Sequence, residues 1–339
     1  MIAPYMVQVG YESQLVIANC QQAQFQWLKE NSGYPLQSNN WIEEIVIRQI
    51  EDFKPDILYL ADPIQFEGKF LRKLNHQPKL VLGWRAALVQ HDIDWSGFDV
   101  MLSSLRPLLE FAVKRGVKYG ELFAPGFPPS IVERVQGITP SKDIVFVGQY
   151  TQIQHAKRGY YLQQIARTAA DKGYTCAFHL SGQREIIPTT LKRYLYNPVY
   201  GLEMHKALRV GRIAFDSRGD IFIFNKNKNN RSKIDISGKD PVNMRIFEAT
   251  GSGVFLLTEH FQNVSKFFEV GKEIETFTDE KELIEKIEFY IEHPDIREKI
   301  ARRGQEKCLK YHSIECRARE LDRIIRKHLA IRKSGSRGC

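Results

Sequence analysis

The segment DPVNMRIFEATGSGVFLLTE begins at Asp240 and contains residue types that could bind a phosphate and a sugar. Asp240 is a favoured helix N-cap, so we expect a helix over 241–250. The free N–H groups and the dipole at the start of a helix attract anions. Asn243 and Arg245 add side-chain donors beside that start, and Glu248 has the chemistry to accept hydrogen bonds from two vicinal hydroxyls.

The same residues also have a purely structural explanation. Asp240 would then only cap the helix, and Arg245 would pair with Glu248 at the i,i+3 spacing. The glycines that follow would only turn the chain. Residue chemistry taken alone favours this explanation slightly.

Further candidates for phosphate binding follow two other predicted strands. In VFVGQY, a strand ends at Gly148, where the absence of a side chain lets the backbone approach a diphosphate, and Gln149 follows it. Lys157 and Arg158 are the next cations, and they either bind that phosphate or simply lie on the first turn of the next helix. Gly182, in HLSGQ, has the position of a nucleotide-side loop, a weak signal that many α/β folds share.

In the first half, GWRAALVQHDIDW follows a predicted strand over Lys79–Leu82. We therefore expect Trp84 and His91 at the carboxyl edge of a sheet, where open α/β folds bind ligands. Trp84 could bind an acceptor and His91 could act as a general base, although a lone histidine in a loop is more often a bystander. Asp92 and Asp94 form a D-x-D pair, but no apolar strand directly precedes it, so a metal site is not expected there.

The composition fits a two-domain α/β protein. The 339 residues are too many for one ordinary domain, and 43% of them are hydrophobic, which is ample for real cores. The five cysteines are scattered without metal-ligand spacing, so we expect reduced thiols. No signal peptide or membrane-spanning run is present in the sequence, and we expect the protein to stay in the cytosol.

The net charge of +9 is concentrated near the end of the chain. Residues 297–337 carry fourteen Lys/Arg against five Asp/Glu, so the rest is about neutral. Such a stretch could contact nucleic acid, anionic lipid or a phosphorylated substrate, but it is more often a solvated helix face. Nothing resembling a nucleic-acid-binding module accompanies it, and no nucleic acid is expected as a partner.

Apolar runs alternate with amphipathic stretches along the chain, which is typical of parallel α/β architecture. We predict strands at Leu15–Ala18, Ile57–Leu60, Lys79–Leu82, Val100–Leu102, Tyr119–Leu122, Ile144–Val147, Cys176–Leu180, Arg212–Phe215 and Val254–Leu257. Helices are predicted at Trp41–Phe53, Pro107–Arg115, 158–172, 202–208, 241–250, 280–291 and 294–309.

The turn-rich APGFPP segment and the strand after it indicate a domain boundary between 130 and 142. We expect an N-terminal domain over 1–136, a C-terminal domain over 137–311, and an amphipathic helix with a basic tail over 312–339. The polar, basic stretch 224–240 is predicted to be an exposed, mobile loop.

From about Asp143 to Ile325, and most specifically in NMRIFEATGSGVFLLTE and the tail after it, the chain resembles the group 1 glycosyltransferases, in particular their spore-maturation-protein-like branch. Val46 to Phe127 is similar to the N-terminal domain of that branch. The resemblance implies a GT-B fold, in which two Rossmann-like domains with parallel sheets face a cleft. It also implies a nucleotide-sugar donor in the C-terminal domain, an acceptor mainly on the N-terminal one, and no obligatory metal or cofactor.

Group 1 enzymes carry two acidic residues separated by seven others, one near the donor sugar and one at the ribose. Asp240 and Glu248 match this spacing, with an Asp in place of the usual first Glu. The chain departs from the family at Gln149, where an Arg is common. It also reaches its first predicted strand only at Leu15, so we expect the usual first strand of the N-terminal domain to be absent, through truncation or a rebuilt acceptor side.

The predicted function is glycosyl transfer from a nucleotide-diphosphate sugar to the hydroxyl of a glycan, lipid-linked or protein acceptor, in cell-surface polysaccharide or glycoconjugate synthesis. Arg245, Glu248 and His91 are the candidate catalytic residues. The candidate donor-binding residues are Gly148, Gln149, Lys157, Arg158, Gly182, Asp240, Asn243, Arg245 and Glu248. Two alternatives stay open: a non-catalytic binding or assembly protein with the nucleotide-sugar fold, and a basic nucleic-acid-binding α/β protein.

Overall fold

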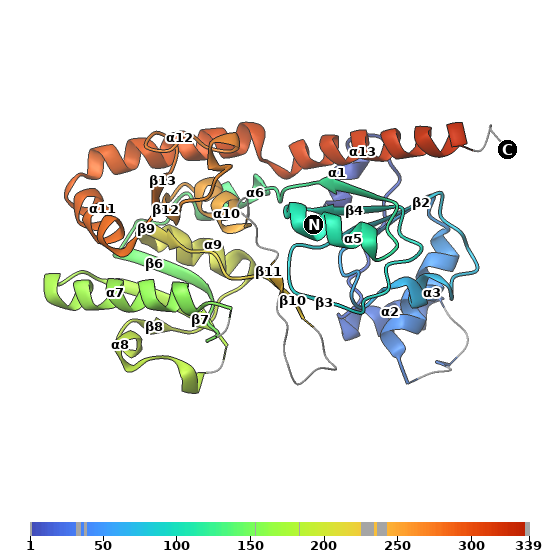
Figure 1. Cartoon of the computed structure of the whole chain (residues 1–339), viewed down its shortest axis with the longest axis horizontal. Helices are drawn as coiled ribbons and strands as arrows, with labels where there is room; N and C mark the ends of the chain where they lie inside the picture. The colour runs from blue at the N-terminus through green and yellow to red at the C-terminus, as the bar shows by residue number, and fades with distance from the viewer. Residues whose placement is uncertain are drawn as a thin grey trace. The chain divides into compact units, whose positions relative to one another are not determined.

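The computed structural model describes residues 2–31, 35–36, 39–152, 154–182, 184–224, 234–235 and 243–335. The chain forms two compact units (Figure 1). The first unit consists of Met1–Ala124, Phe222–Ile236 and Arg317–Cys339, and the second of Pro125–Ile221 and Ser237–Cys316. The chain therefore passes from one unit to the other after Ala124 and after Cys316, where the sequence suggested domain ends at 136 and 311, and the first unit also includes a segment from the middle of the chain.

The first unit contains a four-stranded parallel sheet in which the strands follow one another in chain order. Its strands are β1 (Ile57–Leu60), β2 (Leu80–Trp84), β4 (Val100–Ser103) and β5 (Tyr119–Leu122). A second, three-stranded sheet joins β3 (Val89–Gln90), β10 (Phe222–Phe224) and β11 (Ile234–Asp235). The helices are α1 (Ala3–Val7), α2 (Gln21–Asn31), α3 (Trp41–Phe53), α4 (Gly68–Leu71) and α5 (Arg106–Lys114).

The predicted strand at Leu15–Ala18 is wrong. These residues have no regular secondary structure, and both Leu15 and Ile17 are more than 40% exposed. A run of four apolar residues is too short for its periodicity to distinguish a buried strand from an exposed, irregular segment. The parallel sheet of the first unit thus begins at β1, after three helices.

The last helix, α13 (Ile314–Gly335), packs on the sheet of the first unit. Leu321, Ile324 and Ile325 share a core cluster with Leu82 and Leu102 of β2 and β4. His328 and Lys327 both contact the Glu121 carboxylate on β5. The prediction of an amphipathic helix that docks through its apolar face is therefore confirmed, and it begins two residues later than expected.

The second unit is built on a six-stranded, all-parallel sheet. Its strands are β6 (Lys142–Gln149), β7 (Cys176–Ser181), β8 (Leu195–Tyr196), β9 (Gly211–Asp216), β12 (Phe255–Glu259) and β13 (Glu275–Phe277), in the order β13-β12-β9-β6-β7-β8. The chain runs outward from β6 to β8 and then returns to the other side of β6 with β9. The order of a dinucleotide-binding fold results, with its switch point between β6 and β9.

Helices cover both faces of this sheet (Figure 1). The helices are α6 (Ser130–Val135), α7 (Ala156–Lys172), α8 (Thr189–Lys192), α9 (Gly201–Val210), α10 (Arg245–Gly251), α11 (Glu280–Glu292) and α12 (Pro294–Tyr311), with short 3₁₀ turns at Arg184–Ile186 and Val264–Lys266. Ile144 and Phe146 of β6 join the core cluster under α7 and α11, so Val145 and Val147 point to the opposite face, as strand alternation requires. Among the described residues, no helix is both long and apolar enough to cross a membrane.

Helix α10 begins at Arg245 and not at the predicted Pro241. Asp240, with its neighbours 236–239 and 241–242, lies outside the described residues, as does most of the predicted loop 224–240. The cap-like hydrogen bond at the start of α10 comes from Asn243, whose Oδ1 accepts the Ile246 N–H at 3.3 Å. Asn243, which the sequence treated only as a possible ligand donor, therefore also satisfies a backbone N–H at the start of α10.

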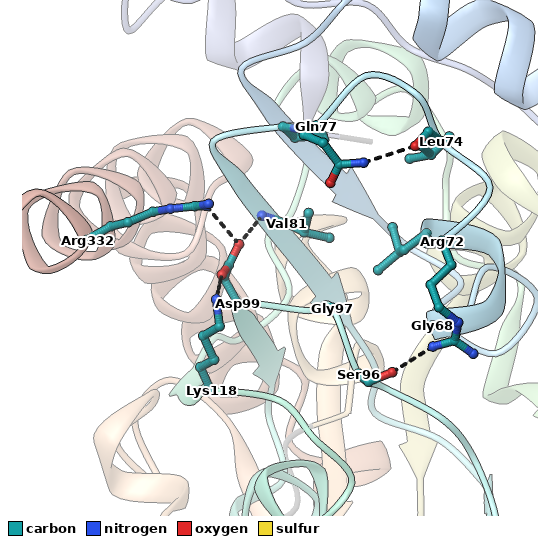
Figure 2. A pocket seen from close by; sticks show the side chains of 12 residues that line it. Gly68, Arg72, Leu74, Gln77, Val81, Ser96, Gly97, Asp99, Lys118 and Arg332 are labelled. Atoms are coloured by element: carbon teal, nitrogen blue, oxygen red, sulfur yellow. Dashed lines mark hydrogen bonds and ion pairs between the residues drawn. The ribbon is translucent and has the colours of Figure 1, made fainter. Parts of the chain in front are cut away.

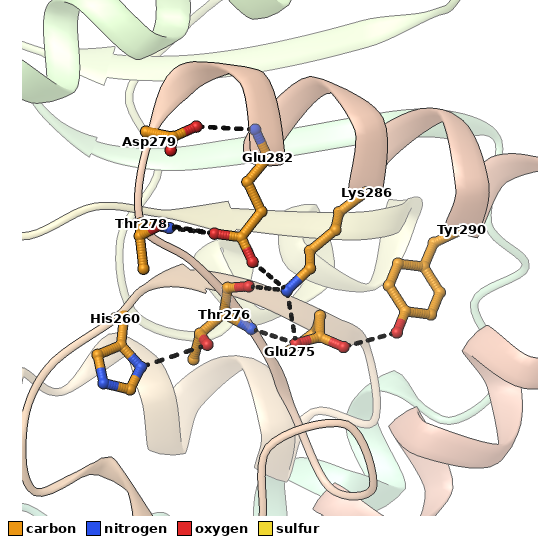
Figure 3. Close-up of polar contacts among 8 residues, drawn as sticks. All are labelled: His260, Glu275, Thr276, Thr278, Asp279, Glu282, Lys286 and Tyr290. Carbon is orange, nitrogen blue, oxygen red and sulfur yellow. Dashed lines mark hydrogen bonds and ion pairs between the residues drawn. The ribbon is translucent and has the colours of Figure 1, made fainter.

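The start of α11 illustrates how this unit satisfies its polar groups (Figure 3). Asp279 accepts the Glu282 N–H at 2.9 Å, and Glu282 accepts the Thr278 hydroxyl at 2.7 Å, which together make a reciprocal cap. Lys286 then joins Glu282 to the buried Glu275 of β13, at 2.7 and 3.1 Å. These hydrogen bonds and the Lys286 ammonium lower the pKa of Glu282 to about 2.

We predict that Glu282→Gln lowers the free energy of unfolding at neutral pH by about 1 kcal/mol, since the cap and the ion pair both use the carboxylate. The folded pKa lies below the ordinary 4.5, so this contribution is present above pH 4.5 and is lost as the pH falls towards 2. Urea unfolding at pH 7 and pH 3 measures it. The control, Glu285→Gln, removes an exposed pair on the same helix and should cost under about 0.5 kcal/mol. Equal losses for Glu282→Gln at both pH values would contradict the assignment.

Candidate active site at the carboxyl edge of the second sheet

Two apolar strands of the second unit, β9 beside the switch point and its neighbour β12, end in polar, buried residues at the carboxyl edge of the sheet. Strand β9 ends in Asp216, followed by Ser217, and β12 ends in Thr258 and Glu259. All four are at least 95% buried. Because burying carboxylates without partners is costly, these residues must be held by cations and hydrogen bonds, and the contacts around them define the candidate site.

Arg158 connects the two strands that flank the switch point. Its Nε donates to the Ser217 carbonyl oxygen at 2.7 Å, and its Nη1 donates to the Gln149 carbonyl oxygen at 3.0 Å. The side chain is 91% buried, and this burial lowers its pKa, although the nearby Asp216 carboxylate opposes the shift. Arg158 therefore fixes the ends of β6 and β9 relative to each other.

Asp216 positions Asn243, which lies just before α10. One carboxylate oxygen, Oδ2, accepts the Thr258 hydroxyl at 3.0 Å and the Asn243 amide at 2.8 Å. Asn243 uses its other side-chain atom to bond the Ile246 N–H. The chain Thr258–Asp216–Asn243–Ile246 thus ties the beginning of α10 to the carboxyl ends of β9 and β12.

Arg245 and Glu248 lie on the first turn of α10 and form an ion pair with 2.9 Å between Nη1 and Oε2. Arg245 also donates from Nη2 to the Val147 carbonyl oxygen of β6 at 2.9 Å. Both side chains are about 15% exposed, so each keeps an accessible edge. Burial raises the pKa of Glu248; Arg245 opposes this shift and Asp216 reinforces it.

Lys157 is the accessible cation of the site, with a side chain that is 54% exposed. Its ammonium pairs with Oε1 of Glu259, while the Ser217 hydroxyl donates to Oε2 at 2.8 Å. Burial would lower the pKa of Lys157, but the hydrogen bond and the charge of Glu259 outweigh it and raise the pKa. Lys157 therefore stays charged at the end of β12.

Close packing excludes a side chain at two of the predicted glycines. A Cβ on Gly148 would lie 2.7 Å from the Phe146 ring. Gly182 has φ of +129°, and a Cβ there would collide with the Tyr150 carbonyl oxygen. The loops after β6 and β7 consequently run close together, with backbone in place of side chains at the carboxyl edge.

His155 is a further polar residue at this edge that the sequence did not single out. It is 91% buried just before α7, and its ring lies 3.1 Å from the Thr151 hydroxyl. Burial and the neighbouring Arg158 charge lower its pKa to about 4. His155 is thus neutral at physiological pH and adds no positive charge to the site.

The structure brings together seven of the predicted site residues within the second unit. Gly148, Gln149, Lys157, Arg158, Asn243, Arg245 and Glu248 surround the switch point, and Gly182 follows the next strand. Asp240 lies outside the described residues. His91 belongs to the first unit and does not follow β2 directly, because β3 comes between them.

His91 lies 3.1 Å from Arg115, at the far end of α5 from the carboxyl edge of the first sheet. The expectation that it lies at that carboxyl edge is wrong: α5 starts after β4 and runs back along the sheet for nine residues before it reaches Arg115. Trp84 is the last residue of β2 and packs against the core under α13. Asp94 of the D-x-D pair is engaged by Arg72 and Ser96.

The sequence reasoning missed Asp216, Ser217, Thr258 and Glu259. Their signal was present, because the apolar runs IAF and FLL end directly in DS and TE. An acidic residue at the carboxyl end of a buried parallel strand faces the ligand-binding edge and must find a cation there. That pairing could have been sought with Lys157 and Arg158.

Comparison with known proteins supports this reading of the fold. Residues 158–323 match a protein-family model described as glycosyl transferase-like, and no curated protein matches the chain. HepE from Anabaena, solved in complex with UDP-glucose, has a TM-score of 0.58 at 8% identity, over 87% of this chain and 84% of its own.

Two other solved structures are similar over comparable lengths. A glycosyltransferase from Rickettsia africae has a TM-score of 0.58 at 9% identity, over 90% of this chain and 87% of its own. The sucrose-phosphate synthase of Thermosynechococcus elongatus has a TM-score of 0.54 at 9% identity, over 88% and 81%. The GT-B fold predicted from the sequence is confirmed, and the family match over residues 158–323 agrees with the prediction of a glycosyltransferase.

We predict that Gly182→Ala lowers the free energy of unfolding by about 2 to 4 kcal/mol, because its φ and the Tyr150 carbonyl both exclude a side chain. The control is Gly173→Ala at the end of α7. Gly173 also has positive φ, at +75°, but nothing lies within 4 Å of the added Cβ, so the cost should be about 1 kcal/mol. Urea unfolding measures both variants. Equal costs would show that the two loops do not approach as closely as described.

Proposed function

We propose that this protein transfers a sugar from a nucleoside-diphosphate sugar to an acceptor hydroxyl, and that the donor binds at the carboxyl edge of the sheet in the second unit. The observation that carries this proposal is the Arg245–Glu248 pair, anchored to β6 through Val147 and set beside the switch point. Ligands of open α/β sheets bind at such points. The block NMRIFEATGSGVFLLTE further leads us to place the protein in the spore-maturation-protein-like branch of the group 1 enzymes.

Each site residue has a distinct proposed role. Glu248 presents a largely buried carboxylate that accepts hydrogen bonds from the two ribose hydroxyls, so a ligand with two vicinal hydroxyls is favoured. Arg245 and Lys157 supply the positive charge for the diphosphate. The buried Arg158 has a positioning role, because two of its nitrogens are already bonded to the carbonyl oxygens of Gln149 and Ser217.

In the reaction, the bond between the anomeric carbon and the diphosphate oxygen breaks while the acceptor oxygen forms a new bond to that carbon. The acceptor hydroxyl releases its proton to solvent water, and the diphosphate leaves with the electron pair of the broken bond and therefore with an additional negative charge. Arg245 and Lys157 stabilise that charge electrostatically. His91 has no part in this proposal, since it lies at the opposite edge of the first sheet from the carboxyl ends of its strands.

The proposal predicts that Glu248→Ala and Arg245→Ala abolish the rise in melting temperature that a nucleoside diphosphate gives the native protein. HepE was solved with UDP and with UDP-glucose, so uridine diphosphate is the first probe, followed by the guanosine, adenosine and cytidine diphosphates. Transfer from the matching sugar nucleotide should fall at least about a hundredfold, as for the loss of a buried charged contact.

A matched control is available on α9, where Glu203 and Lys206 form another i,i+3 ion pair at 2.8 Å that is more exposed. Glu203→Ala and Lys206→Ala should leave both the thermal shift and the transfer rate unchanged. Glu248→Gln, which preserves volume, separates loss of the carboxylate from loss of packing. Full binding by Glu248→Gln and Arg245→Ala would refute the proposed donor site.

We also expect transfer to need no added divalent metal, because Arg245 and Lys157 provide the positive charge next to the leaving group. The activity should therefore remain within about twofold of its initial value in excess EDTA. The measurement is the rate of release of the nucleoside diphosphate before and after dialysis against the chelator. A loss that Mg²⁺ or Mn²⁺ restores would show that a metal takes part.

The basic residues of 297–337 support a second proposal, that the protein contacts anionic membrane lipid or a lipid-linked acceptor from the cytoplasmic side. On α12 and α13 the exposed cations include Lys299, Arg302, Arg303 and Arg323. Attraction of such cations to anionic lipid falls with salt. The protein should sediment with phosphatidylserine vesicles at low salt and be released at high salt. Equal recovery in the supernatant at both salt concentrations would exclude this contact.

A further inference from the structure

The first unit contains a cavity of about 520 Å³ that none of the roles above uses (Figure 2). It lies at the amino ends of β2 and β4, where Val81 and Asp99 line it, and the end of α13 closes one side with Arg332. Every residue that lines it belongs to the first unit, so it is separate from the candidate active site in the second. The volume is within the range of small-ligand pockets.

One part of the cavity wall is apolar. Leu71, at the end of α4, and Leu74 and Pro78, in the connection to β2, line it together with Val81. This surface accommodates a hydrocarbon or ring portion of a ligand. Simple inorganic ions would leave most of this volume to water.

The opposite part carries a buried carboxylate between two cations (Figure 2). Asp99 accepts the Val81 N–H at 2.9 Å and the Lys118 ammonium at 2.7 Å, and the Arg332 guanidinium lies 3.7 Å from its Oδ2. The Asp99 side chain is only 10% exposed, whereas those of Lys118 and Arg332 are 60% and 55% exposed. Two cations that share one buried anion leave an excess of one positive charge on the cavity side.

A third cation, Arg72, lines the cavity but is balanced. Its guanidinium bonds Asp94 at 2.8 Å and the Ser96 hydroxyl at 2.9 Å. The excess charge is therefore located at Lys118 and Arg332. One Lys118 proton is directed at Asp99, and an ammonium carries three, so it has the donors to bond a further anion as well.

We infer that this cavity binds a small organic anion, with its phosphate or carboxylate group against Lys118 and Arg332 and its apolar portion against Leu71, Leu74 and Pro78. The amino edge of a parallel sheet is not the edge at which such folds bind their substrates, so the ligand is an accessory one. The bound anion also contacts α13 through Arg332. The Arg332 side chain donates to the Lys79 carbonyl oxygen next to β2. Binding here does not require sugar transfer in the second unit.

The test uses the full chain and three probes that share one ring: phenyl phosphate, benzoate and neutral phenol. Isothermal titration at constant ionic strength should show phenyl phosphate or benzoate binding at least about tenfold more tightly than phenol, because only the anions pair with Lys118 and Arg332. Whichever anion binds more tightly identifies the head group as phosphate or carboxylate. Equal binding of all three probes, or no binding of either anion, would overturn the inference.

Variants assign the binding to this cavity. Lys118→Met and Arg332→Met should each weaken binding of the preferred anion at least about fivefold, while Lys118→Arg, which keeps the charge, should retain it. Lys69→Met is the matched control, since Lys69 lies on α4 beside the cavity, is 74% exposed and does not line it. Thermal unfolding of each variant reports whether it is folded.

Two further measurements distinguish this cavity from the donor site. Glu248→Ala should bind the anion as the native protein does, whatever its effect on nucleotide binding. Hydrogen exchange should show protection of residues 329–335, at the end of α13, when the anion is bound. Anion binding that is unchanged in both Lys118→Met and Arg332→Met, or that is lost in Glu248→Ala, would place the ligand elsewhere and refute the inference.

Discussion

The site in the second unit depends on one buried guanidinium. Arg158 donates to carbonyl oxygens at the ends of β6 and β9, the two strands from which the chain departs in opposite directions across the sheet. Strands that diverge at a switch point leave backbone groups without ladder partners. The Arg158 guanidinium has several fixed donors and supplies hydrogen-bond partners for two such carbonyl oxygens. Its own charge is balanced by Asp216 and Glu259, among others. The positions of the accessible residues around Arg158 depend on these contacts.

The residues at the carboxyl edge of the second sheet fall into two groups, those that fix the strand ends and those that are accessible to solvent. Arg158, Asp216 and Glu259 are buried and hydrogen-bonded, whereas Lys157, Arg245 and Glu248 keep accessible atoms. Buried charges of both signs preorganise the edge before any ligand arrives, which limits the cost of reorganisation when a diphosphate binds. The first unit contributes a different feature, a parallel sheet whose core is completed by the last helix of the chain.

The sequence predicted the regular elements well where a strong local pattern existed. Helix α3 has the predicted bounds, Trp41–Phe53, because Asn40 caps it and its apolar face is periodic. The prediction of a strand at Leu15 was wrong, because a short apolar run does not show whether other elements of the fold bury it. The start of α10 at Arg245 was not predicted, because the hydrogen bond that Asn243 accepts there goes with a tertiary contact between Asn243 and Asp216. Arg158 shows the same limit, because its role depends on the carbonyl oxygen of Ser217, which is distant in sequence.

The central claim is that a nucleoside diphosphate binds beside the carboxyl ends of β6 and β9. A crystal structure of the protein soaked with uridine diphosphate tests it most directly. The account predicts ribose hydroxyls within hydrogen-bonding distance of the Glu248 carboxylate and phosphate oxygens near Arg245 and Lys157. A nucleotide bound at any other place in the second unit, with Glu248 still paired only to Arg245, would contradict it.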